Sequence, residues 1–117
     1  MIILPIKRKW YEMILTGEKK EEYREIKPYY KSRFKKVFSM HPYSFIPYGQ
    51  DVHEVVFRNG YSKESPSFTA LCSLDIKTGR EEWGAEPEVE YYVLTIKEII
   101  EGTQEGENNG AGKKAKI

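Results

Sequence analysis

A dense run of ionisable residues directly after a glycine is the part of this sequence best suited to chemistry. Residues 17–24 read G-E-K-K-E-E-Y-R. On a strand, side chains alternate between two faces. The alternation predicts one face with Lys20, Glu22 and Arg24, and an opposite face with Lys19, Glu21 and Tyr23. A face with mixed charges is costly to bury unless the charges pair or meet a ligand, so the run predicts a paired ionic cluster or a binding site.

The surrounding pattern predicts the elements that position this run. Apolar residues at helical spacing predict a helix over residues 7–16, with Gly17 at its C-terminal cap, and a second helix over residues 28–38. Strands are predicted at residues 2–6, 19–26, 52–57, 68–76 and 91–100, with loops at 39–50 and 83–87. Five or six short strands with two helices indicate an α+β fold built on a small closed or nearly closed β-barrel.

The charged run also carries a family signature. Gly17, Lys19, Glu22 and Arg24 fit the pattern G-x-K-x-x-E-x-R of ASCH domains, which are small β-barrels of the PUA-like superfamily. The segments L-P-I-K at 4–7, F-R-N-G-Y at 57–61 and W-G-A-E-P at 83–87 resemble further parts of bacterial and phage members. The chain therefore resembles this family over most of residues 1–101, and the resemblance implies a PUA-like barrel there.

The resemblance implies either nucleic-acid binding or hydrolysis. Some small bacterial members resemble amidohydrolases that act on N4-acetylcytidine with a lysine, a threonine three residues later and a glutamate from a later loop. The lysine falls on Lys19, the threonine position holds Glu22, and Glu86 is the best match for the later glutamate. Glu22 departs from the pattern, because a carboxylate beside Lys19 keeps the ammonium charged and favours binding over base catalysis. A ribonuclease with a glutamate base and a Lys19 or Arg24 cation is a further alternative.

The leading hypothesis is recognition of RNA or a nucleotide-like small molecule in a cleft between Lys19, Glu22, Arg24 and the Trp83–Glu86 loop. Cationic side chains are expected to contact phosphates, aromatic ones to stack on bases, and loop residues to read base edges. These candidates are Lys7, Lys20 and Arg24 for phosphates, Tyr23 and Trp83 for stacking, and Arg58 and Asn59 for base edges. A module that binds a protein through the acidic run at residues 81–90 is the second alternative, and whether the chain is an enzyme stays open.

Charge distribution and cysteine content bear on the kind of partner and on the location expected for this chain. Net charge is +1, but residues 1–40 carry eleven Lys/Arg and five Glu, whereas the remainder carries eight Lys/Arg and thirteen Asp/Glu. A basic, aromatic-rich half suits a phosphate backbone. Cys72 is the only cysteine, so no internal disulfide is expected, and a single thiol predicts a cytoplasmic location. Neither histidine has metal-ligand spacing around it, so no metal or cofactor is expected. We expect a monomer without a membrane span, and a disordered tail over residues 102–117.

Overall fold

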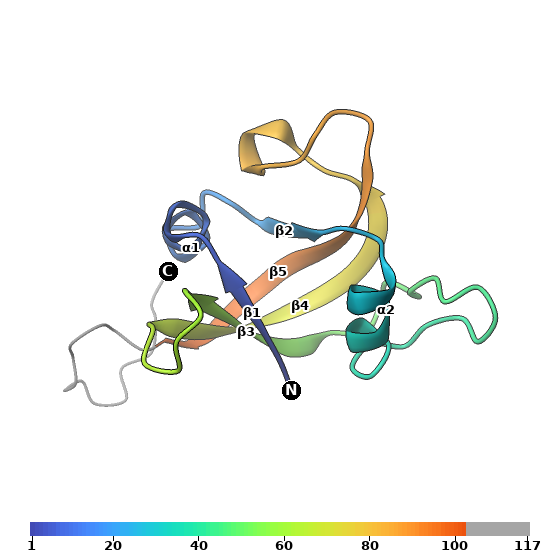
Figure 1. The fold of residues 1–117 in the computed structure, drawn as a ribbon, viewed down its shortest axis with the longest axis horizontal. Helices are drawn as coiled ribbons and strands as arrows, with labels where there is room; N and C mark the ends of the chain where they lie inside the picture. The colour runs from blue at the N-terminus through green and yellow to red at the C-terminus, as the bar shows by residue number, and fades with distance from the viewer. Residues whose placement is uncertain (103–117) are drawn as a thin grey trace.

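Five strands and two α-helices make up the described part of the chain, as the sequence predicts (Figure 1). The structure is a computed structural model that describes residues 1–102. The elements are, in order, β1 (Ile2–Ile6), α1 (Arg8–Leu15), β2 (Glu21–Arg24), α2 (Pro28–Phe34), β3 (His53–Asn59), β4 (Ser67–Thr78), a 3-10 helix (Glu81–Trp83) and β5 (Glu90–Gly102). Of the predicted tail, only Gly102 is described, where it ends β5; residues 103–117 lie outside the described part.

The strands form one sheet in the order β1-β3-β4-β5-β2. The β1–β3 pair is parallel and the other pairs are antiparallel. The sheet curls into a half-barrel, and Figure 1 shows β1 and β2 facing each other across its open side. The α+β fold is thus confirmed in its coarse form. The two edge strands β1 and β2 border a seam, in which the signature residues lie.

The core fills the inside of this curled sheet. Alternate residues of β1 point inward, and the aromatic residues of the α2 region meet those of β5: the Phe34 and Tyr92 ring centroids lie 5.1 Å apart, edge to face. Cys72 is fully buried in β4, and burial raises the pKa of its thiol to about 12, as expected for a small packed side chain. The principal core residues are Ile2, Leu4, Ile6, Tyr11, Ile14, Phe34, Phe38, Val55, Phe57, Phe68, Ala70, Cys72, Leu74, Tyr92 and Leu94.

Several element boundaries differ from the sequence prediction. Strand β2 begins at Glu21 rather than residue 19, because the Lys19 N–H still bonds to the Met13 carbonyl (2.9 Å) at the end of α1. Helix α2 ends at Phe34, after which the Val37 N–H bonds to the Phe34 carbonyl (3.0 Å) in a tighter turn. Arg58 and Asn59 belong to β3 rather than to a turn. Within residues 1–102, no helix is long and apolar enough to span a bilayer.

The loop between α2 and β3 is tied down by Asp51. The Asp51 carboxylate accepts the Ser39 N–H (2.9 Å) and pairs with His53 Nε2 (2.8 Å). Burial alone would raise the pKa of Asp51, but these partners outweigh it and hold the pKa below 3.8. The stabilisation that Asp51 contributes is therefore present above about pH 4 and lost as the pH falls through the lowered pKa.

Asp51→Asn is expected to lower the free energy of unfolding by about 1 kcal/mol at pH 7, because the amide is a weaker acceptor for Ser39 and carries no charge for His53. Urea unfolding of both proteins from pH 7 to pH 3 measures this, and the difference should shrink below pH 4. Glu54→Gln, at an exposed position of β3, is the control and should change little at any pH. A difference that stays constant with pH would contradict the assigned role of the carboxylate.

Candidate functional site

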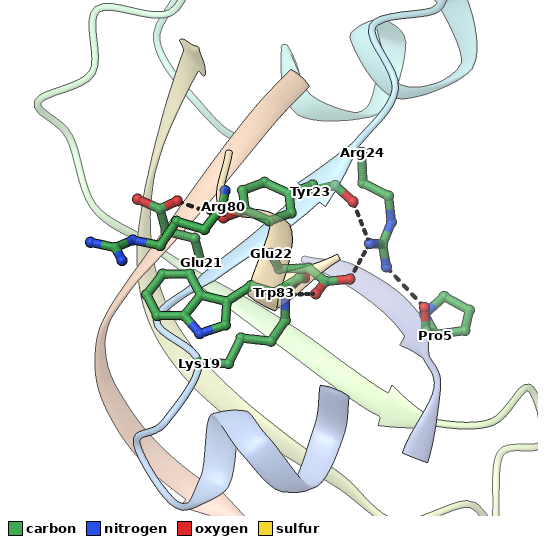
Figure 2. A network of polar contacts seen from close by, with 8 residues as sticks. All are labelled: Pro5, Lys19, Glu21, Glu22, Tyr23, Arg24, Arg80 and Trp83. Carbon is green, nitrogen blue, oxygen red and sulfur yellow. Dashed lines mark hydrogen bonds and ion pairs between the residues drawn. The ribbon is translucent and has the colours of Figure 1, made fainter. Parts of the chain in front are cut away.

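The signature residues form a buried ionic cluster in the seam between β1 and β2, shown in Figure 2. Lys19 Nζ lies 3.2 Å from Glu22 Oε1, and the other Glu22 oxygen pairs with Arg24 Nη1. Arg24 also donates to the Tyr23 carbonyl (2.8 Å) and, through Nη2, to the Pro5 carbonyl of β1 (2.9 Å). We call Lys19, Glu22 and Arg24 the ionic triad. The bond from Arg24 Nη2 to the Pro5 carbonyl joins the two edge strands, which share no backbone ladder.

Local backbone geometry turns Lys19 into this cluster. Gly17 ends α1 with φ +86°, a left-handed conformation that favours glycine, and the chain then enters β2. Because Lys19 precedes the strand, the strand alternation does not apply to it, and its side chain lies with Glu22 rather than on the opposite face. Lys20 is exposed, and its Nζ donates to the Gly17 carbonyl (3.1 Å). The predicted face assignments of Lys19 and Lys20 are therefore wrong, whereas Glu22 and Arg24 do share a face.

Lys19 is enclosed on every side that the structure describes. Its exposure is 1%, and Nζ donates to the Trp83 carbonyl at 2.6 Å. The ammonium also lies 4.7 Å from the Trp10 ring centroid and 4.9 Å from that of Tyr23. Burial lowers the pKa of Lys19, outweighing the opposing effect of Glu22. The ammonium is thus engaged by protein groups, while Lys19 also lines a cavity of about 280 Å³ beside β5.

The segment between β4 and β5 covers the other face of β2. The Tyr23 hydroxyl donates to Glu21 Oε1 (2.8 Å) and accepts the Arg80 N–H (2.9 Å), and burial raises the pKa of Tyr23. Trp83 packs beside Tyr23 in the same small cluster. The Tyr23 ring, 9% exposed, thus presents no face for a base to stack on in this conformation.

The other predicted residues lie apart from the ionic triad. Glu86 is exposed and lines a separate cavity of about 360 Å³ together with Glu25 and Glu90. Lys7 is exposed at the start of α1. Arg58 and Asn59 sit in β3 opposite Pro5 and Ile6 of β1; Arg58 Nε is buried without a hydrogen-bond partner among the described residues. Within the same residues, no three His, Cys, Asp or Glu side chains are grouped so as to hold a metal ion.

One cavity is a groove along β1 that the sequence did not reveal. It measures about 640 Å³, runs along β1, and collects side chains from the α2 region and from the loop after β3. Its lining is Met1, Ile2, Ile3, Leu4, Pro5, Tyr29, Tyr30, Arg33, Lys36, Val37 and Tyr61. We call it the β1–α2 groove. It holds three tyrosines and two cations and no carboxylate, a composition unlike that of the ionic triad.

The groove and the ionic triad are neighbours. The Arg24 guanidinium carbon lies 5.9 Å from the Tyr30 ring centroid, and its Nη2 bonds to Pro5, which lines the groove. Arg33 lies 4.2 Å from the Tyr29 ring centroid, so this ring is backed by a cation. The meeting of the α2 region with β1 depends on the seam that Arg24 bridges.

Glu22→Gln is expected to lower the free energy of unfolding by about 3–5 kcal/mol, because it leaves Lys19 and Arg24 buried without a counter-charge. Glu25→Gln makes the same chemical change at an exposed glutamate and should cost less than about 0.5 kcal/mol. Urea unfolding at pH 7 compares the two variants with the wild type. Equal, small effects of both substitutions would mean that the triad is solvated rather than buried.

No known protein family, no curated protein and no solved structure matches this chain. A function therefore has to be inferred from the contacts, charges and cavities of the chain itself.

Proposed function

We propose that this chain is a PUA-like domain of the ASCH type that binds single-stranded RNA, with the β1–α2 groove as its binding surface. Two features support the family assignment: the half-barrel architecture, and the meeting of the signature residues Lys19, Glu22 and Arg24 in one cluster. The groove supports the activity. Its combination of tyrosines and cations without a carboxylate is the single observation on which the proposal depends.

The chemistry of the groove suits an unpaired nucleic-acid strand. Proteins bind single strands through aromatic rings that stack on bases and through cations that follow the phosphates. Tyr29 and Tyr61 are 55% and 87% exposed, so both rings are accessible to a ligand, and Arg33 and Lys36 supply positive charge in the same groove. A volume of about 640 Å³ lies within the usual range of ligand sites.

The ionic triad supports this surface from inside. Glu22 is shared by two cations, and Lys19 and Arg24 donate their remaining bonds to carbonyls of Trp83 and Pro5. These groups are therefore engaged within the protein rather than offered to a ligand. By bonding to Pro5, Arg24 fixes β1 relative to β2 and so holds one wall of the groove. The proposal thus moves the binding surface away from the Lys19–Trp83 cleft that the sequence favoured.

A hydrolase is the second candidate, and the lowered pKa of Lys19 beside Glu22 favours it. Such an enzyme would have to displace the Trp83 carbonyl before Lys19 met an amide or a phosphodiester. Incubation of the protein with N4-acetylcytidine and with RNA, followed by mass spectrometry, tests this candidate. Product formed by the wild type and by Lys20→Ala, but not by Lys19→Arg that retains its fold, would establish it.

Removal of a groove cation is expected to weaken RNA binding. Arg33→Ala and Lys36→Ala should each reduce the affinity for a single-stranded oligonucleotide and reduce the salt slope by about 0.7, the value for one phosphate contact on a single strand. Tyr29→Ala should cost about 1–3 kcal/mol of binding free energy through lost stacking, with the salt slope nearly unchanged. Fluorescence anisotropy at several salt concentrations measures both quantities.

Lys20→Ala is the matched control, because Lys20 is an exposed lysine that lines a different cavity, of about 280 Å³, on the β5 side of the domain. It should leave affinity and salt slope unchanged. If Lys20→Ala weakens binding while Arg33→Ala and Lys36→Ala do not, RNA is bound at the cleft predicted from the sequence. If no oligonucleotide binds even at low salt, the proposed function is wrong.

A further inference from the structure

We propose that the β1–α2 groove identifies one unpaired base through the main chain of Ile3. The inference rests on the proposed RNA-binding function and adds to it the group that gives sequence preference. The group lies on the outer edge of β1, which no other strand within residues 1–102 covers.

The geometry of β1 shows which peptide groups face this edge. β1 pairs with β3 on one side only. The Pro5 carbonyl accepts Arg24 Nη2 across the seam, so it points away from β3 (Figure 2). Proline has no N–H to give to a ladder and sits in edge strands at positions that face outward. Because peptide groups alternate along a strand, the N–H and C=O of Ile3 point the same way as the Pro5 carbonyl.

The outer edge of Ile3 is therefore a donor and an acceptor side by side. Outside the sheet ladders, no backbone hydrogen bond to either Ile3 group occurs among residues 1–102. Ile3 itself is 43% exposed and lines the groove, so a ligand in the groove can reach its main chain. Unpaired main-chain N–H and C=O groups at a sheet edge can bind a ligand that presents an acceptor and a donor at matching positions.

Pro5 disfavours a peptide strand, and so favours a base, as the ligand of the β1 edge. An added β-strand would need successive donors and acceptors along the edge, but Pro5 lacks an N–H and its carbonyl already accepts from Arg24. Between Met1 and Pro5, Ile3 is thus the one residue of this edge that offers both a peptide N–H and a free C=O. A base presents one adjacent donor and acceptor on its Watson–Crick edge, which matches a single pair.

A fixed N–H and C=O pair distinguishes two kinds of base. Adenine and cytosine carry an exocyclic amino donor next to a ring-nitrogen acceptor, whereas guanine and uracil carry a keto acceptor next to a ring N–H donor. A base stacked in one orientation on Tyr29 or Tyr61 presents its donor and its acceptor to Ile3 in a fixed order. Only one of the two arrangements complements the N–H and C=O of Ile3. Cytosine and uracil are the sharpest comparison, because they have the same size and differ in this order.

The test uses single-stranded oligo-C and oligo-U of equal length with the full chain, measured by fluorescence anisotropy. The wild type should bind one of them at least about fivefold more tightly, a difference of about 1 kcal/mol. Ile3→Pro removes the outward N–H together with part of the Ile3 side chain, and it should bring the two affinities within about twofold, with the salt slope unchanged. Ile3→Val keeps the N–H and should keep the preference.

The outcomes separate this inference from the proposed function. Equal binding of both oligonucleotides by the wild type overturns the inference and leaves RNA binding intact, whereas no binding of either overturns both. A preference retained in a folded Ile3→Pro protein overturns the role of Ile3. If that variant does not fold, the Ile3 amide signal of the wild type decides by NMR: it should shift downfield with the preferred oligonucleotide, and an unchanged signal at saturation refutes the contact.

Discussion

The ionic triad of Lys19, Glu22 and Arg24 is the interaction on which the rest of this structure depends. A lysine at 1% exposure is tolerated only when its charge is compensated, and here one glutamate compensates two cations. The remaining donors reach the carbonyls of Trp83 and Pro5. Each buried cation thus has a counter-charge and a carbonyl partner, which makes its geometry specific, and removing a partner leaves a buried charge uncompensated.

The triad explains how a sheet with two unpaired edges stays a half-barrel. β1 and β2 share no ladder, and the bond from Arg24 to Pro5 takes the place of one. Tyr23 and Lys19 hold the segment that follows β4, through the Arg80 N–H and the Trp83 carbonyl. The same few residues therefore connect three segments that are distant in sequence. In this account the signature is a framework, and the ligand surface is the groove that the framework leaves beside β1.

Much of the fold follows from the sequence because its determinants are local. The first strand, the first helix and Gly17 were predicted within one residue, since apolar spacing and a positive-φ glycine act over short distances. The α+β class and the five strands followed for the same reason. The start of β2 was missed because Lys19 is held by the Met13 carbonyl of the preceding helix, a contact that no alternating pattern contains.

The site was predicted less well than the fold because it depends on contacts between distant segments. Lys19, Glu22, Arg24, Tyr23 and Trp83 were selected from residue types and from the family signature, and they do meet. Residue types could not show that these groups would satisfy one another. The β1–α2 groove joins Ile3, Tyr29 and Tyr61 from three segments, so its existence depends on sheet order rather than on any run of sequence. Glu86 was selected for its loop and lies in another cavity.

Photo-crosslinking of the full chain to single-stranded RNA that contains 4-thiouridine, with the crosslinked peptides identified by mass spectrometry, tests the central claim most directly. The account predicts crosslinks at Tyr29 or Tyr61 and at the peptides that carry Ile3 and Arg33, with none at Trp83. Crosslinks concentrated at Trp83, Lys20 and Glu86, with the β1–α2 groove unlabelled, would contradict it and would make the signature residues themselves the binding site.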